Sequence, residues 1–330
     1  MSDKLLNVEQ LKTYYDTRFG EKIFAVDGVS FDLEEGKVLG IAGESGCGKS
    51  TLALSLIGLF AKPLCYDSGA IVIKGRDVTQ LDKETRRVEI LGKKIAYIPQ
   101  SAMNALNPTA KIKNFIFDIM KEHFPDMTKE EVFKLAKERF KELNLDERVL
   151  HSYPNELSGG MKQRTVIAIS TIMNPDILVA DEPTSALDVS TQKVVMKMLM
   201  SLMEKKIVKS MIFITHELPL LFHIADNIMV MYAGECVEYG TSEDVVFKPL
   251  HPYAVELMTS IVVPEVGQKG HKLSSIPGAP PNLKYKMTGC RFAPRCSLAT
   301  EACTEADVEE TVVGHRRYRC VMDRKVKSDV

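Results

Sequence analysis

The sequence lacks any apolar run long enough to cross a membrane. A membrane-spanning helix needs roughly 18 consecutive apolar residues, whereas the best runs here, around residues 52–60 and 166–173, stop at about ten. The N-terminal stretch MSDKLLNVEQ also lacks the apolar core of a signal peptide. We therefore expect a chain that is made and kept in the cytosol, where its seven cysteines should not form disulfides.

The sequence also lacks an excess of charge of either sign. Its 43 basic and 44 acidic side chains nearly cancel, so we expect no broad nucleic-acid footprint and no nucleic-acid partner. Apolar residues make up 45% and charged residues 26%, a balance that excludes a disordered or collagen-like chain. The length of 330 residues is about twice that of a typical domain, which predicts one large domain with an appendage.

The spacing of short apolar runs predicts an α/β core. A run at residues 38–42 precedes a glycine-rich stretch and a helix-length apolar segment at 51–60, which is the layout of a phosphate-binding unit. Continuous apolar runs at 177–180 and 211–215 are typical of strands inside a parallel sheet that is covered on both faces. Further strands are expected at residues 5–17, 24–33, 71–74 and 95–98.

Two other regions differ in pattern from this core. Thr128 and Glu131 have the spacing of a capping box, and apolar residues follow at helical intervals, so a helical insertion is expected at about residues 101–160. From about Pro264 the composition shifts, and residues 274–281 are rich in proline and glycine, which predicts an extended linker. We therefore divide the chain into residues 1–263 and 264–330.

The stretch GESGCGKST, residues 43–51, fits the pattern G-x-x-x-x-G-K-[ST]. Its glycines let the backbone curl so that successive N–H groups point at phosphate oxygens. Lys49 would bridge the outer phosphates and Ser50 would ligate magnesium, while the following helix presents its positive end to the anion. An unrelated glycine turn is the alternative, but it would not require a preceding strand and a following helix. The expected nucleotide contacts are Gly43, Ser45, Gly46, Cys47, Gly48, Lys49, Ser50 and Thr51; Cys47, like Cys65 and Cys236, is otherwise interpreted as a small packing residue.

Two acids close the predicted strand at 177–180. An acid at the carboxyl end of a sheet strand faces the ligand crevice. Asp181 suits the magnesium shell, and Glu182 suits a general base for the attacking water. Taken alone, such a pair is more often a turn, but the glycine loop elsewhere in the chain favours the catalytic interpretation.

The stretch LSGGMKQ is the third candidate element. Ser158 can cap the helix that follows, and Gly159 and Gly160 leave its N–H groups open to an anion. A simple helix start is the alternative. The presence of a phosphate loop in the same chain favours a second phosphate-binding helix.

Together these motifs resemble those of the nucleotide-binding subunits of ATP-binding-cassette (ABC) transporters, over essentially residues 1–260. GESGCGKST resembles the Walker A motif, ILVADE the Walker B motif and LSGGMKQ the family signature. Gln100 occupies the Q-loop, Ser185 to Asp188 the D-loop, and His216 the position of the switch histidine. The resemblance also implies an aromatic residue that stacks on adenine; Tyr15 is our choice, with Tyr14 and Phe19 as rivals.

The resemblance implies a fold, a set of ligands and a catalytic role. It implies a P-loop NTPase core with an N-terminal antiparallel β subdomain and a helical signature subdomain. Magnesium and ATP would be held by Ser50, Gln100 and Asp181 together with the phosphate loop. Two cassettes would sandwich ATP head to tail, so that the signature residues act on the partner's nucleotide. Glu182 and His216 would be catalytic, because every expected catalytic position is intact.

The last part of the chain carries four cysteines, and its sequence indicates which branch of the family the chain resembles. Residues 276–281, the stretch GCRFAPRC and the motif HPY at 251–253 resemble oligopeptide and dipeptide transporter ATPases. Four thiolates can hold zinc or an iron–sulfur cluster. Zinc sites usually contain a C-x2–4-C pair, which is missing here, and the subfamily resemblance implies a 4Fe–4S cluster; zinc and unligated thiols stay open as alternatives. The expected ligands are Cys290, Cys296, Cys303 and Cys320, with His315 as a substitute.

The resemblance finally implies a peripheral subunit on the cytoplasmic face of the cell membrane. Its expected partners are a second, related ABC ATPase, two transmembrane permease subunits and an extracytoplasmic peptide-binding protein. The expected role is ATP hydrolysis that powers uptake of dipeptides or oligopeptides. Import of nickel or another small solute is the alternative, followed by a soluble ABC ATPase acting on nucleic acid or ribosomes, or a metal sensor with a vestigial ATPase.

Overall fold

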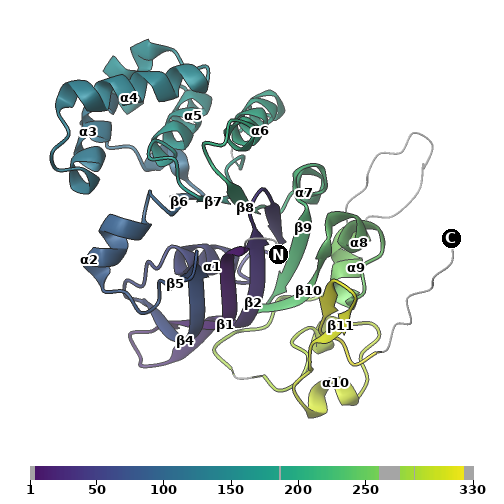
Figure 1. The fold of residues 1–330 in the computed structure, drawn as a ribbon. Helices are drawn as coiled ribbons and strands as arrows, with labels where there is room; N and C mark the ends of the chain where they lie inside the picture. Colours follow the sequence, from purple (N-terminus) through teal and green to yellow (C-terminus); the bar gives the residue numbers. More distant parts are fainter. Residues whose placement is uncertain (1–3, 186, 260–275, 286, 323–330) are drawn as a thin grey trace, which may run out of the picture.

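The computed structural model of the protein describes residues 4–185, 187–259, 276–285 and 287–322, which build two sheets with helices around them (Figure 1). The smaller sheet comes from the first third of the chain and is antiparallel, in the order β2-β1-β4-β5. Its strands are β1 (Lys4–Asp16), β2 (Lys22–Glu34), β4 (Leu64–Ile73) and β5 (Arg76–Asp77).

The larger sheet has the strand order β11-β12-β10-β9-β3-β8-β7-β6. The strands from β9 to β6 are parallel to one another, and β10, β12 and β11 join antiparallel at one edge. Parallel pairing places the carboxyl ends of β3 and β7 at the same edge of the sheet, where the phosphate loop and the two acids follow. The strands are β3 (Val38–Ala42), β6 (Ile95–Ile98), β7 (Ile177–Asp181), β8 (Ser210–Ile214), β9 (Asn227–Tyr232), β10 (Glu235–Thr241), β11 (Thr311–Val313) and β12 (Arg316–Tyr318).

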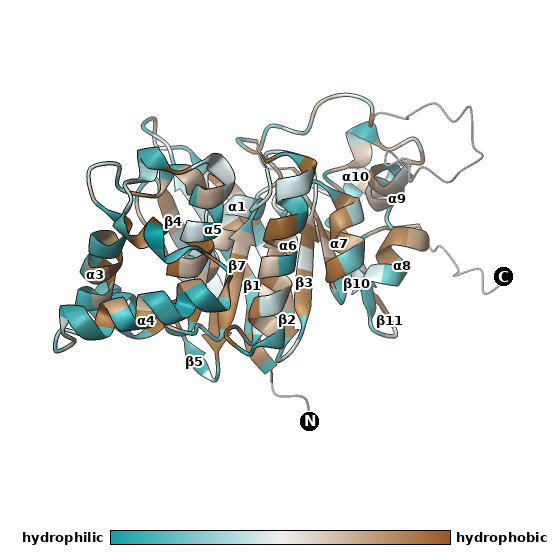
Figure 2. Ribbon diagram, turned by 90° about the horizontal axis from the view of Figure 1, so that it is seen from above, coloured by the Kyte–Doolittle hydropathy of each residue, from teal (hydrophilic) through white to brown (hydrophobic). Residues whose placement is uncertain are grey.

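The parallel strands are buried on both faces, as their continuous apolar runs predict. Every residue of β3, β7 and β8 is buried. In β8, Ile212 and Ile214 enter the core shared with the antiparallel sheet, whereas Met211 and Phe213 enter the core on the helical side. Figure 2 shows hydrophobic residues along these central strands and many hydrophilic ones along the outlying α4.

The chain between β6 and α5 is helical, as expected for the insertion. Thr128 caps α4, and its side chain and that of Glu131 form the predicted capping box. Figure 1 shows α3, α4 and α5 grouped together, away from the antiparallel sheet. The helices of the described residues are α1 (Lys49–Leu56), α2 (Lys83–Thr85), α3 (Ile112–His123), α4 (Lys129–Glu142), α5 (Gly159–Ser170), α6 (Val189–Glu204), α7 (Leu218–Ile224), α8 (Ser242–Phe247), α9 (Pro252–Thr259) and α10 (Ala302–Glu305).

The C-terminal extension pairs directly with the larger sheet. Strand β12 lies beside β10, with Tyr318 opposite Glu238. The Arg316 guanidinium donates to the buried carboxylate of Glu238 at 2.9 Å, which compensates the charge at this junction. The expected boundary at 263/264 lies outside the described residues. No helix in the described part of the chain combines the length and apolar character needed to span a membrane.

Candidate active site

The phosphate loop, residues 43–51, connects the buried strand β3 to helix α1. Gly43 and Gly48 have φ angles of 148° and 105°, values that side-chain-bearing residues rarely adopt. A Cβ at Gly43 would overlap the carbonyl oxygen of Met231, and one at Gly48 would overlap that of Ala25. Glycine is therefore required at both positions by the backbone angle and by the lack of space.

Lys49 lies inside the curve of this loop. Its side chain is buried, and its ammonium group donates to the carbonyl oxygens of Gly43 at 2.7 Å and Glu44 at 2.9 Å. These two hydrogen bonds fix the position of the positive charge at the mouth of the loop. An ammonium held in this way can neutralise the outer phosphates of a nucleotide.

A cavity of about 300 Å³ opens in front of the loop. Nine of the residues that the sequence predicted as site residues line this cavity. They belong to the phosphate loop, to β1 and to the two segments that follow β6 and β7. Ile23, Ala25 and Leu283 also line it and were not expected, because apolar residues of a strand or a linker give no motif. The expected residues in its wall are Tyr15, Ser45, Gly46, Gly48, Lys49, Ser50, Thr51, Gln100 and Glu182.

Glu182 is held from two sides at the end of β7. Its Oε1 lies 3.1 Å from Nδ1 of His216, and its Oε2 accepts a hydrogen bond of 2.9 Å from Gln100 Nε2. The residue has a φ of 46°, in the left-handed region that is strained for a side chain of this size. The structure thus brings Gln100, Glu182 and His216 into one hydrogen-bonded group, although 116 positions of sequence separate the first and last.

Asp181 is almost completely buried next to the loop. Its Oδ2 accepts a 3.2 Å hydrogen bond from the Tyr97 hydroxyl, and its Oδ1 has no hydrogen-bond partner in the described part of the chain. Burial raises the pKa of Asp181, while the hydroxyls of Ser50 and Tyr97 act in the opposite direction. A buried carboxylate oxygen without a partner, beside the Ser50 hydroxyl, is a donor set that suits a hard divalent cation.

The three candidate aromatic residues have different surroundings. The Tyr15 hydroxyl lies 3.1 Å from Thr51 Oγ1, and Tyr15 lines the cavity. Tyr14 instead packs its ring against Phe24, with 5.5 Å between the centroids. Phe19 is 88% exposed. Of the three, only Tyr15 borders the cavity.

The signature residues lie apart from this cavity. Ser158 caps α5, and its hydroxyl accepts from the N–H of Met161 at 3.3 Å. Ser158 and Gly159 are exposed, Gly160 is partly exposed, and none of them lines the cavity. Gln163 of the same helix donates to the Pro183 carbonyl at 2.7 Å, which ties α5 to the segment that follows Glu182.

The four C-terminal cysteines line a single small pocket, together with His251 and Phe292. Burial raises the pKa of Cys290 to about 11 and also raises that of Cys296. No group of three or more His, Cys, Asp or Glu side chains in the described ranges is arranged to hold a metal ion, so the metal-binding character of the extension is not shown. His315 is not part of this pocket: its Nε2 lies 2.7 Å from Asp244.

Comparisons with known proteins agree with this geometry. A family model described as ABC transporter matches residues 26–185, and one described as oligopeptide/dipeptide transporter, C-terminal region, matches residues 237–303. The chain is 41% identical to the dipeptide transport ATP-binding protein DppD of Lactococcus lactis, over 90% of this chain and 84% of that protein. It is 37% identical to the oligopeptide transport ATP-binding protein OppD of Escherichia coli, over 96% and 93% of the two.

Solved structures give the same answer at the level of the fold. The ATP-binding cassette MJ0796, in a dimeric post-hydrolysis state bound to ADP and Pi, superimposes with a TM-score of 0.61 and 30% identity. The match covers 72% of this chain and 98% of that one. The α/β P-loop NTPase fold expected from the sequence is therefore confirmed. With these motifs, this fold and these relatives, the chain belongs to the ATP-binding subunits of ABC transporters, in the group that carries the oligopeptide/dipeptide transporter C-terminal region.

Proposed function

We propose that this chain is the ATP-hydrolysing subunit of an ABC importer that powers the uptake of dipeptides or oligopeptides. The observation that carries the proposal is the cavity in which the phosphate loop faces Gln100 and Glu182, with Asp181 buried beside Ser50. The C-terminal family match and relatives named for dipeptide and oligopeptide transport support the substrate class.

The loop binds the triphosphate mainly through its backbone. N–H groups of residues 43–51 and the start of α1 give a concave, positively polarised surface for phosphate oxygens. Lys49 adds a full positive charge at the mouth of the loop. The Ser50 hydroxyl, the Asp181 carboxylate and the Gln100 side chain would hold the magnesium that accompanies ATP. Tyr15 places its ring against the adenine.

Glu182 acts as the general base for hydrolysis. Its carboxylate accepts a proton from a water molecule as the water oxygen bonds to the γ-phosphorus. The bond from the γ-phosphorus to the β,γ-bridging oxygen breaks, and ADP leaves with that electron pair. His216 and Gln100 hold the carboxylate in place through the two hydrogen bonds described above, and His216 contacts the γ-phosphate.

A second cassette completes the site. Ser158 and Gly159 are exposed and lie away from the cavity of their own chain, which supports contact with a nucleotide held by another chain. We assign that role to a second, related ATPase. Two transmembrane permease subunits and an extracytoplasmic peptide-binding protein complete the importer, with this chain on the cytoplasmic face of the membrane. Gln100 and the helical segment at about 101–160 transmit the nucleotide state to the permeases.

The cysteine pocket holds a 4Fe–4S cluster in this proposal. Its support is the convergence of Cys290, Cys296, Cys303 and Cys320 on one pocket and the subfamily resemblance. A cluster supplies a structural cross-link for a short extension with little core of its own. Iron and acid-labile sulfide in the purified chain, both lost in Cys296→Ser, are the expected result. A colourless protein with stoichiometric zinc would contradict this assignment.

Replacement of the base tests the catalytic proposal. Glu182→Gln should keep its affinity for magnesium ATP within about two-fold and lose at least about a hundred-fold in turnover, because a general base contributes roughly that factor. The matched control is Glu204→Gln, at the exposed end of α6, which should hydrolyse ATP normally. Unchanged hydrolysis in Glu182→Gln would refute the assigned base.

Copurification tests the transport proposal. The Glu182→Gln variant, retrieved from membranes with ATP present, should bring down a second ATPase and permease subunits. ATP turnover in an assembly reconstituted with the wild-type chain should rise with a peptide-loaded binding protein. Recovery of RNA or DNA in place of membrane subunits would contradict a role in transport.

A further inference from the structure

We propose that the C-terminal extension forms part of the nucleotide site, with Arg295 as a positioning residue that neutralises and orients Glu44 of the phosphate loop. This inference rests on the proposed nucleotide site. Arg295 Nη1 donates to Glu44 Oε2 at 2.6 Å, and Nη2 donates to Oε1 at 3.0 Å. The Arg295 side chain is only 5% exposed. Such a bidentate pair, with the arginine buried and Glu44 partly buried, fixes direction as well as charge.

Glu44 links this arginine to the lysine that faces the nucleotide. Its carboxylate is held by Arg295, whereas its carbonyl oxygen accepts from Lys49 Nζ at 2.9 Å. Its N–H donates to the Tyr253 hydroxyl at 2.8 Å. All three polar parts of Glu44 are thus held in place, and two of the three contacts come from residues beyond the ATPase core motifs.

Aromatic packing joins Tyr253 to the same segment of the extension. The Phe292 ring lies against Tyr253 and Tyr232, with centroid separations of 5.3 and 5.2 Å. Arg295 Nη1 also donates to the Tyr232 hydroxyl at 3.2 Å. Arg295 therefore contacts the loop directly at Glu44, and Phe292 supports it through Tyr253. Both residues also contact Tyr232, so they belong to one buried cluster.

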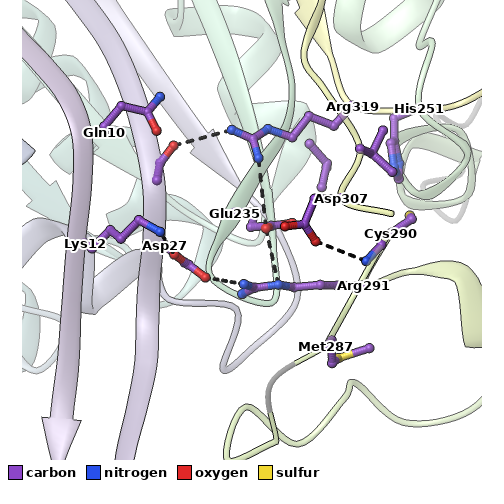
Figure 3. Close-up of a pocket in the computed structure, with 14 residues that line it drawn as sticks. Gln10, Lys12, Asp27, Glu235, His251, Met287, Cys290, Arg291, Asp307 and Arg319 are labelled. Atoms are coloured by element: carbon purple, nitrogen blue, oxygen red, sulfur yellow. Dashed lines mark hydrogen bonds and ion pairs between the residues drawn. The ribbon is translucent and has the colours of Figure 1, made fainter. Parts of the chain in front are cut away.

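A second arginine of the extension supports the middle of the loop. Arg291 pairs with Asp27 and donates to the Ala233 carbonyl at 2.6 Å; Figure 3 shows the arginine reaching Asp27 and Glu235. The next residue, Gly234, donates its N–H to the carbonyl of Cys47 at 2.9 Å. Residues 290–296 thus brace the phosphate loop at both Glu44 and Cys47.

Because Glu44 is charged, its pairing with Arg295 affects the affinity of the loop for ATP. A carboxylate at the start of a loop that binds a triphosphate would repel the ligand if it were unpaired, and the partly buried position weakens screening. Arg295 neutralises that charge and holds both carboxylate oxygens at its guanidinium group. Loss of Arg295 should therefore weaken nucleotide binding, and removal of the Glu44 charge should restore it.

The test compares four variants of the full-length chain: Arg295→Gln, Glu44→Gln, the double variant, and Arg317→Gln as control. Arg317 belongs to the same extension but pairs with Glu310 at 3.5 Å and lies over the Tyr239 ring, away from the loop. The dissociation constant for magnesium ATP, the turnover at saturating ATP and Tm are measured for each.

Arg295→Gln should weaken magnesium ATP binding about two- to thirty-fold, the usual range for a residue that acts through another, with little change in turnover at saturation. The double variant should return to within about two-fold of the wild type, and Arg317→Gln should bind normally even if its Tm falls. If Arg295→Gln does not fold, Arg295→Lys can be used in its place. This variant keeps the positive charge but cannot form both hydrogen bonds to Glu44, and it should have an intermediate affinity.

Equal affinities for Arg295→Gln and Arg317→Gln would overturn the inference, as would a double variant no better than Arg295→Gln alone. A wild-type affinity in Arg295→Lys would overturn the part of the inference that concerns orientation. Failure of the wild-type chain itself to bind magnesium ATP would instead refute the proposed function.

Discussion

Replacement of Gly48 by alanine should disable the nucleotide site far more than it destabilises the fold. Gly48 precedes α1 and has a φ of 105°. A methyl group there would overlap the carbonyl oxygen of Ala25, well inside the 3.0 Å at which Cβ contacts essentially end. Backbone atoms cannot rotate out of the way, so the loop or strand β2 must move.

The expected effect of Gly48→Ala has two components, a loss of folding stability and a loss of catalysis. The unfavourable φ costs about 1–2 kcal/mol of folding stability, which is a fall of about 2–8 °C in Tm at about 2–4 °C per kcal/mol. Relief of the overlap requires a shift of about 1 Å in the phosphate loop or in the Ala25 segment, both of which line the cavity. Displacement of that size can cost about a hundred-fold in catalysis.

Gly36→Ala separates the two parts. Gly36 has a φ of 82°, and a Cβ there would meet open space in the turn between β2 and β3. This control should lose a similar amount of stability from backbone strain and keep normal affinity for magnesium ATP. Equilibrium binding, turnover and thermal unfolding of both variants decide the matter. Normal ATP binding by Gly48→Ala would refute the close-approach argument.

Two further predictions concern the groups around the cavity. Burial raises the pKa of Asp181, so the folded state takes up a proton at this carboxylate more readily than the unfolded chain does. The ionised carboxylate therefore lowers the free energy of unfolding. This cost is complete at neutral pH and is relieved as the pH falls through the raised pKa. Asp181→Asn should therefore raise Tm at pH 7 without magnesium, by about 2 °C per kcal/mol recovered, and should lose magnesium-dependent turnover; a lower Tm would contradict the assigned cause. Tyr15→Ala should weaken ATP binding about ten-fold, in the range of base–aromatic stacking, whereas Tyr15→Phe keeps the ring and should bind nearly normally. Tyr14→Ala, whose ring packs on Phe24, is the control, and equal loss in both alanine variants would refute the choice of Tyr15.

Local sequence signals predicted the parts of the fold that local physics dictates. The capping box at Thr128 and Glu131 was recoverable because its two partners are three residues apart. The strands at β3 and β6 were recoverable from their short apolar runs. Pairing of β12 with β10 was not, because short strands with charged residues such as Arg316 and Arg317 have no strand pattern.

The residues of the candidate site likewise fall into those that a sequence motif identifies and those that it does not. The phosphate loop and the Asp181–Glu182 pair were identifiable because nucleotide-binding motifs require fixed residue types at fixed spacing. Tyr97, which donates to Asp181, and Leu283, which lines the cavity, were missed because a single tyrosine or leucine carries no motif.

The amino-acid sequence by itself determined the family, the phosphate loop and the Asp181–Glu182 pair at the end of β7, since these depend on residues that are neighbours along the chain. Only the tertiary structure decided that Arg295 meets Glu44 across 251 positions, that the four C-terminal cysteines converge on one pocket, and that the signature residues lie away from the cavity of their own chain. Contacts over such separations arise from how sheets and extension pack together, and neither residue of such a pair carries a local signal of its partner.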